Sequence, residues 1–203
     1  MRIKVCGLGL ETQIRALQKM NFDFAGFIFY KKSPRYVLNF LELKDLKKFN
    51  EIKKVGVFVN ENPEEITKIC EAAQLDLVQL HGNESLEEVE QLNSILPIIK
   101  VIHMRGEKEE IQAKIDEYEK AASFLLFETP SQDYGGSGKT FDWAMIDALN
   151  FSKPYFLSGG LSLENIENFK GLKKIPYALD VNSQFEISPG CKNLNLLKKL
   201  KNK

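Results

Sequence analysis

The feature that most constrains the fold is the alternation of short apolar segments with amphipathic segments along the whole chain. Eight segments rich in β-branched and aromatic residues predict strands, and several are apolar at nearly every position, as is typical of parallel strands covered on both faces. The segments between them have helical periodicity; Leu10, Ile14 and Leu17, for example, share one apolar face. The predicted strands span residues 2–6, 24–29, 54–59, 75–81, 97–102, 123–128, 154–159 and 177–182.

This alternation predicts an α/β protein, for which two architectures are open. One is a doubly wound open sheet. We favour a parallel eight-stranded (β/α)8 barrel (a TIM barrel), because strands without an antiparallel insertion close naturally and closure leaves no exposed edge. The 203 residues, shared among eight units, leave about 25 for each, which is at the lower end for such barrels. No linker divides the chain, so we expect a single domain over residues 1–203.

The composition limits the classes of partner. The 28 basic residues balance 28 acidic ones, so no net charge attracts nucleic acid or an anionic membrane. No apolar run approaches the ~18 residues of a membrane span, and the first residues lack the apolar core of a signal peptide. Three cysteines lie far apart, which argues for a reducing compartment and against a disulfide framework. We therefore expect a cytoplasmic protein.

In a barrel, the chemistry lies where strands end and helices begin. Cys6 and Glu128 end two predicted strands and are candidates for acid–base chemistry. A free thiol has a pKa of about 8.5, so a base role for Cys6 requires surroundings that lower it; a buried structural thiol is the alternative. Glu128 follows the apolar run SFLLF, which is expected to raise the pKa of its carboxyl and keep it protonated as a general acid. A solvated loop glutamate is the alternative.

Gly159 and Gly160 follow the seventh predicted strand and form a candidate phosphate site. Two glycines let the backbone approach a ligand closely, and a helix expected over 163–169 offers unpaired N–H groups at its start. Barrels often bind phosphate at the loops after strands 7 and 8. We therefore expect a phosphorylated small-molecule substrate; a plain strand-to-helix turn is the alternative.

Arg35 and His81 are candidate binding residues. Arg35 is one of four arginines in a lysine-rich chain, and its planar fork suits a carboxylate held at two points; a surface arginine is the alternative. His81 either contacts a substrate or serves as a structural hydrogen-bonding group. No set of His, Cys, Asp and Glu has the sequence spacing of a metal site, so no metal is expected.

Taken together, these segments resemble the phosphoribosylanthranilate isomerase family of tryptophan biosynthesis. The resemblance covers nearly the whole sequence, and the order and spacing of its motifs make it specific. It is carried by KVCG (4–7), GFIFYKKSPRYV (26–37), VGVFVNENPEEI (55–66), LDLVQLHGNE (75–84), YGGSGKTFDW (134–143), LSGGLSLENI (157–166) and ALDVNSQFEISPGCK (178–192).

The resemblance implies an Amadori rearrangement without a cofactor. N-(5′-phosphoribosyl)anthranilate becomes 1-(2-carboxyphenylamino)-1-deoxyribulose 5-phosphate. Cys6 matches the general base, which takes the proton from C2′ of the opened sugar. Glu128 stands where the family's general acid is an aspartate, so its carboxyl reaches about 1.5 Å further. A misplacement of that size can cost ~10²-fold in rate.

The resemblance also implies binding roles. Arg35 matches the arginine that holds the anthranilate carboxylate, and Gly159 and Gly160 match the phosphate loop. Asp180 matches an acidic residue near the substrate, and His81 has a supporting role.

The second phosphate loop contains Ser183 and departs from the family. Gln184 follows it in place of a glycine, which restricts the backbone there. The sequence leaves the oligomeric state open between monomer and homodimer.

The segment GGSGKT (135–140) is a near match to a nucleotide-binding P-loop. The position that must be glycine is Asp133, whose carboxylate faces the phosphates it should hold. We interpret the segment as a lid over the acid. Three alternatives stay open: a related phosphosugar barrel acting on a histidine-pathway substrate or indoleglycerol phosphate, a P-loop nucleotide switch, and a non-catalytic phosphate-binding barrel.

Overall fold

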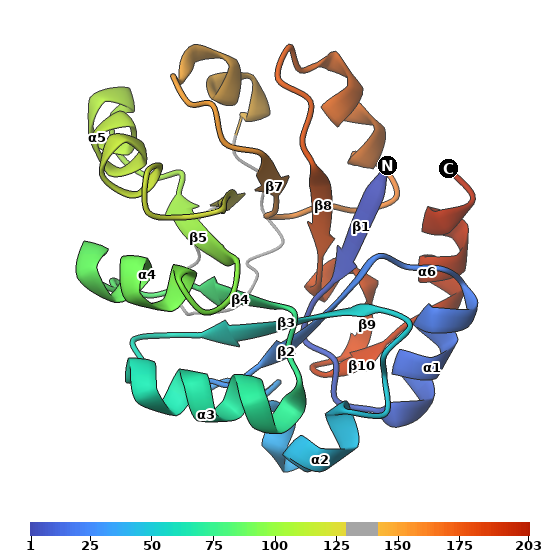
Figure 1. Cartoon of the computed structure of the whole chain (residues 1–203). Helices are drawn as coiled ribbons and strands as arrows, with labels where there is room; N and C mark the ends of the chain where they lie inside the picture. The colour runs from blue at the N-terminus through green and yellow to red at the C-terminus, as the bar shows by residue number, and fades with distance from the viewer. Residues whose placement is uncertain (129–141) are drawn as a thin grey trace.

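The computed structural model describes residues 1–128 and 142–203 and has a closed ring of eight parallel strands (Figure 1). Each strand pairs with the next in the chain, and the last pairs with the first. The predicted (β/α)8 barrel is confirmed, and the doubly wound sheet is wrong. The strands are β1 (Arg2–Val5), β2 (Phe24–Ile28), β3 (Lys53–Phe58), β4 (Leu77–Leu80), β5 (Ile98–His103), β6 (Phe124–Glu128), β7 (Tyr155–Leu157) and β8 (Ala178–Val181).

Helices surround the ring, and the sequence specifies where several of them begin (Figure 1). The Asn62 side chain accepts a hydrogen bond from the Glu64 N–H at the start of α3, and Ser85 with Glu88 forms the expected capping box of α4. Within the described ranges, no helix is long and apolar enough to cross a membrane. The α-helices are α1 (Glu11–Lys19), α2 (Leu43–Leu46), α3 (Pro63–Ala73), α4 (Leu86–Asn93), α5 (Lys108–Tyr118) and α6 (Leu194–Lys201).

The first helical segments described after β6, β7 and β8 are 3₁₀ helices, as is a turn after β2, and the helix expected over 163–169 begins later. The Ser162 and Glu164 N–H groups are already bound, to side-chain oxygens of Asn165 and Ser162 respectively. The 3₁₀ helices within the described residues are η1 (Val37–Asn39), η2 (Trp143–Ala148), η3 (Ile166–Gly171) and η4 (Ser183–Phe185). A two-stranded hairpin, β9 (Glu186–Ser188) and β10 (Cys191–Lys192), follows η4.

Two apolar regions stabilise the barrel. One lies between the strands and the helices, and the other fills the interior of the ring, as in other barrels of this class. Aromatic rings contribute strongly to the interior, where Phe24 and Phe156 meet edge to face at 5.5 Å between centroids. The interior cluster consists of Phe24, Val55, Leu77, Ile99, Val101, Leu126, Phe156 and Ala178.

A buried ion pair outside the ring fixes the loop after β4. Lys100 Nζ lies 2.5 Å from Glu84 Oε2, and both side chains are 2% exposed. Lys100 also donates to the Gly82 carbonyl, while Glu84 accepts from the backbone N–H groups of Gly82 and Asn60. The charges thus hold the chain immediately after His81 in one conformation.

We expect Lys100→Met to lower the free energy of unfolding by about 3–5 kcal/mol, because it leaves the Glu84 carboxylate buried without its cation. Urea denaturation measures the change, and Lys44→Met, which removes an exposed lysine, is the control and should cost less than about 1 kcal/mol. Adding Glu84→Gln to Lys100→Met should recover part of the loss. A Lys100→Met variant as stable as the control would contradict this account of the loop.

Candidate active site

A cavity of about 510 Å³, part of which is open to solvent, lies at the carboxyl ends of the strands. It brings together four predicted site residues that are distant in sequence: Cys6, His81, Glu128 and Asp180. A thiol, an imidazole and two carboxylates therefore face one space, which is the arrangement that acid–base chemistry requires. The other described lining residues are Ile28, Tyr30, Ser33, Val57, Val59, Gln79, Ser158 and Asn182.

Cys6 lies beside an ion pair inside the barrel. Lys4 Nζ is 2.9 Å from Asp180 Oδ2, and the Lys4 side chain has no exposed surface. Burial raises the pKa of the Cys6 thiol, whereas the positive charge of Lys4 lowers it. Burial also lowers the pKa of the Lys4 ammonium, but Asp180 and Cys6 raise it above its ordinary value. Lys4 therefore stays charged next to a thiol that burial keeps protonated.

Glu128, at the end of β6, is held in place by a contact with His81, which follows β4. His81 Nε2 lies 2.9 Å from Glu128 Oε2, and Nδ1 of the same ring lies 3.2 Å from the Gln79 amide nitrogen. An ionised Glu128 can only accept at this contact, so Nε2 of His81 carries a hydrogen that points at the carboxylate. A chain of two hydrogen bonds thus fixes the Glu128 side chain.

The expectation that apolar surroundings raise the pKa of Glu128 is wrong. Burial does raise it, but the charge and the hydrogen bond of His81 outweigh this effect, and the net pKa lies below the ordinary value. The carboxyl of the unliganded protein is therefore ionised near neutral pH. The sequence could not reveal this, because His81 is 47 positions away in the chain.

His103, at the end of β5, was missed by the sequence analysis and completes a cluster with His81 and Glu128. One ligand atom from each of the three lies within 4.8 Å of the others, so the fold assembles a set capable of holding a metal that sequence spacing did not indicate. Two of those atoms already bind each other, since His81 donates to Glu128. Burial lowers the pKa of His103, and His81 lowers it further, so the His103 ring is neutral.

Arg35, predicted to bind a carboxylate, is held by a carboxylate of the protein itself. Its Nε lies 3.0 Å from both Glu186 oxygens and its Nη2 lies 2.7 Å from Oε2. Lys192 Nζ lies 2.6 Å from Oε1 of the same carboxylate and 2.7 Å from Asn182 Oδ1. The Arg35 and Glu186 side chains are 10% and 5% exposed. Two buried cations therefore share one anion, which leaves a positive excess next to Asn182, a lining residue of the cavity. The three charged residues themselves are not among its described lining residues.

The predicted phosphate loops differ in how their backbone is arranged. Gly159 and Gly160 have positive φ of 90° and 65°, which only glycine adopts readily, and neither N–H donates a hydrogen bond within the described part of the chain. Ser183 lies in η4 after β8, and Gln184 in the same turn has an ordinary backbone and an exposed side chain. The segment GGSGKT, interpreted as a lid, lies outside the described residues.

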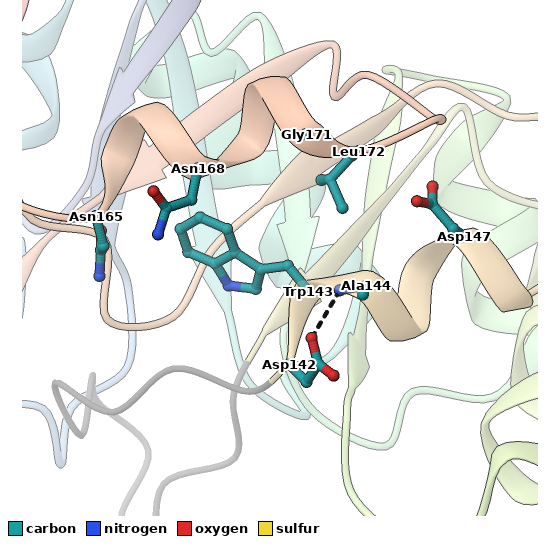
Figure 2. A pocket seen from close by; sticks show the side chains of 8 residues that line it. All are labelled: Asp142, Trp143, Ala144, Asp147, Asn165, Asn168, Gly171 and Leu172. Carbon is teal, nitrogen blue, oxygen red and sulfur yellow. Dashed lines mark hydrogen bonds between the residues drawn. The ribbon is translucent and has the colours of Figure 1, made fainter.

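A second cavity, of about 700 Å³, lies between η2 and η3 (Figure 2). Trp143 projects into this region, and Asp142 and Asp147 both accept hydrogen bonds from backbone N–H groups. None of the predicted site residues is among its described lining residues. We therefore place the chemistry in the cavity at the strand ends.

Lys4, Glu186 and Lys192 were also missed, for different reasons. Lys4 could have been found, because residues two apart in a strand point to the same face, and Lys4 is two positions before Cys6. Glu186 and Lys192 lie in a hairpin whose position depends on contacts far away in the chain.

Comparison with known proteins identifies one family. The profile described as N-(5'phosphoribosyl)anthranilate (PRA) isomerase matches residues 3–203. The N-(5'-phosphoribosyl)anthranilate isomerase of Parabacteroides distasonis is 38% identical over 202 residues, covering 98% of this chain and 90% of that protein. The phosphoribosyl anthranilate isomerase structure from Thermus thermophilus has a TM-score of 0.84 at 27% identity and covers 100% of this chain and 97% of its own. An isomerase in complex with reduced 1-(o-carboxyphenylamino)-1-deoxyribulose 5-phosphate has a TM-score of 0.82 at 29% identity, with the same coverage.

We expect Glu186→Gln to destabilise the protein by about 3 kcal/mol at pH 7, because Arg35 and Lys192 lose their shared carboxylate. Burial raises the pKa of Glu186, but the Arg35 hydrogen bond and the Lys192 charge bring it below the ordinary value. A lowered carboxyl pKa stabilises the fold above the unfolded value, about 4.3, and this contribution is lost as the pH falls through the folded value. The difference between wild type and variant should therefore shrink below about pH 4.

Urea denaturation at pH 7 and at pH 3 measures both effects. Glu11→Gln is a matched control, because it removes a carboxylate from the exposed pair with Arg15 and should cost less than about 1 kcal/mol. A Glu186→Gln variant that matches the control at both pH values would show that the shared carboxylate contributes nothing.

Proposed function

The chain belongs to the N-(5'-phosphoribosyl)anthranilate isomerase family of tryptophan biosynthesis, and from this premise we propose that Cys6 and Glu128 are the base and the acid of its reaction. One observation carries the assignment: the two side chains come from β1 and β6 ends yet line one cavity. Family membership confirms the resemblance noted in the sequence. It leaves the nucleotide switch and the non-catalytic barrel without support.

The reaction needs one proton donor and one proton acceptor. Glu128 protonates the furanose ring oxygen, the ring opens, and the lone pair of the anthranilate nitrogen forms the C1′ imine. Cys6, as thiolate, then removes the proton from C2′, and the resulting enolamine tautomerises to the ketone. Proton transfers of this kind contribute ~10²–10⁴-fold each and require no cofactor.

Glu128 must carry a proton when substrate is bound, although it is ionised in the unliganded protein. A substrate with a carboxylate and a phosphate adds negative charge to the site and displaces water. Both effects raise the pKa of a neighbouring carboxyl. The hydrogen bond from His81 meanwhile keeps the carboxyl in place, so His81 supports the acid.

The binding roles follow the charges around the cavity. Arg35 and Lys192 together carry more charge than Glu186 neutralises, and this excess suits the anthranilate carboxylate. The N–H groups of Gly159 and Gly160, which donate to no other described residue, suit the phosphate, with Ser183 on the neighbouring loop. Asp180 has one buried oxygen, Oδ1, without a hydrogen-bond partner among the residues that the structure describes, and this oxygen suits a substrate hydroxyl.

The remaining assignments concern the protein as a whole. We assign residues 1–203 to a single isomerase domain that acts in the cytoplasm on a small phosphosugar. A related isomerase from Thermotoga maritima is described as dimeric. This supports the homodimer, which is one of the two oligomeric states, monomer and homodimer, that the sequence leaves open.

We expect Cys6→Ser and Glu128→Gln each to lower kcat by about 10²–10⁴-fold, because each removes one proton-transfer group. The fluorescence decay of phosphoribosylanthranilate measures turnover. Substrate affinity and the urea midpoint should change little, since both replacements are nearly isosteric. Full activity in either variant would remove that residue from its role.

Arg35→Lys should act mainly on binding. A lysine keeps the charge but cannot hold a carboxylate at two points, so we expect KM to rise by about tenfold while kcat changes less. Arg15→Lys, at an exposed position on α1, is the control and should leave both constants unchanged. An unaltered KM in Arg35→Lys would place the substrate carboxylate elsewhere.

A further inference from the structure

We propose that Lys4 is a positioning residue for the base: its ammonium group, buried inside the barrel between Asp180 and Cys6, holds the negative charge that Cys6 carries when it accepts a proton. The inference deepens the proposed function, because it names the group that allows a buried thiol to act as a base. It rests on the contacts of Lys4 and on the shape of the space around Cys6.

Lys4 and Cys6 share the space above Gly26 on the neighbouring strand. A Cβ atom placed on Gly26 would lie 2.9 Å from Cys6 Sγ and 3.2 Å from Lys4 Cε. Both side chains therefore pack against the backbone of β2 at Gly26, where no side chain separates them from it. The Lys4 side chain has no exposed surface, so its ammonium group is shielded from bulk solvent.

The negative charge of Asp180 disfavours a thiolate on Cys6, whereas the positive charge of Lys4 favours it. The register between β1 and β8 places Lys4 opposite Asp180, and the Cys6 N–H donates to the Val181 carbonyl at 2.9 Å. A second anion on Cys6 would meet the Asp180 carboxylate at close range in a buried site. A cation that pairs with Asp180 and also attracts the thiolate makes two anions tolerable there.

The other charged groups around the thiol come from several elements. Lys192 on β10 adds positive charge, since its Nζ lies 3.4 Å from the position of a Cβ on Gly7. Glu128 on β6 and His81 on β4 lie across the cavity and bind each other. Lys4 is the larger of the two positive influences on Cys6.

A purely structural role would look different, and the chain contains an example. Lys54 on β3 is 3% exposed, but its Nζ donates to the carbonyls of Leu46 and Ala73, at 3.3 and 3.2 Å. It satisfies backbone carbonyls, whereas Lys4 pairs with the side chain of Asp180, which lines the cavity. Lys54→Met is therefore a matched control for Lys4→Met, because each removes one buried ammonium group from a barrel strand.

The experiment measures the ionisation of Cys6 directly. The intact protein is treated with methyl methanethiosulfonate over a range of pH, and peptide mass spectrometry gives the modification rate of each cysteine. The midpoint of the rate profile reports where the Cys6 thiol ionises. Cys191, which is partly exposed, serves as the reference in the same sample.

Two variants should move the Cys6 midpoint in opposite directions. Lys4→Met should move it upward by about 1–3 pH units, because the thiolate loses its nearest cation. Asp180→Asn should move it downward, because the Lys4 ammonium then has no competing carboxylate and stabilises the thiolate more strongly. Lys54→Met should leave it unchanged, and no variant should alter the Cys191 profile.

Opposite movements support the proposal, and a general loosening of the barrel cannot produce them. An unchanged midpoint in a folded Lys4→Met variant, or movement in the same direction for both variants, would overturn it. If Lys4→Met does not fold, Asp180→Asn decides alone: a midpoint that rises or stays constant overturns the proposal.

The result is separable from the proposed function. In kcat/KM, the limb that rises with pH should move with the Cys6 midpoint in both variants if Cys6 is the base. Opposite midpoint shifts combined with a fully active Cys6→Ser variant would keep the role of Lys4 at the thiol and refute the role of Cys6 in catalysis.

Discussion

The pairing of β1 with β8 is the constraint on which the rest of the structure depends. It joins segments 176 residues apart, and its register decides which side chains meet inside the ring. Because Lys4 stands opposite Asp180, closure forms the ion pair, and because the Cys6 N–H binds the Val181 carbonyl, closure also fixes the thiol. An open sheet built from the same strands would separate the thiol from Asp180 and leave Lys4 without its partner.

Closure also explains why charged groups are concentrated inside an otherwise apolar protein. A buried charge is tolerated when a partner is held at short range, and the strands supply that rigidity. Lys4 pairs with Asp180, 176 positions away, and Arg35 with Glu186, 151 positions away, while Lys192 binds the same Glu186 from within the hairpin. Since these charges are oriented before any ligand arrives, they need little reorganisation during the reaction, which is the general basis of electrostatic catalysis.

The sequence predicts the parts of this arrangement that depend on local pattern. All eight strands were predicted close to their observed positions, and Cys6, His81, Glu128 and Asp180 were found because parallel strands bring their carboxyl ends together. What the sequence could not supply is pairing across the ring. Arg35 carries the expected fork, but nothing near it indicates that Glu186, 151 positions away, already occupies that fork. The pKa of Glu128 was misjudged for the same reason, since its direction depends on His81.

The glutamate at position 128 is best understood through this cross-ring pairing. Residue 128 is on β6 and His81 follows β4, with β5 between them, so the two backbones are separated by roughly 9–10 Å at ordinary strand spacing. The additional methylene extends the carboxyl toward His81, which it meets at 2.9 Å, and His103 on β5 lies beside that contact with its ring 5.4 Å from the His81 ring. The longer side chain therefore keeps one position, because the hydrogen bond with His81 fixes its carboxyl group. The penalty expected for a glutamate in place of an aspartate assumes a carboxyl displaced into the substrate, whereas here the additional length is taken up by the contact with His81.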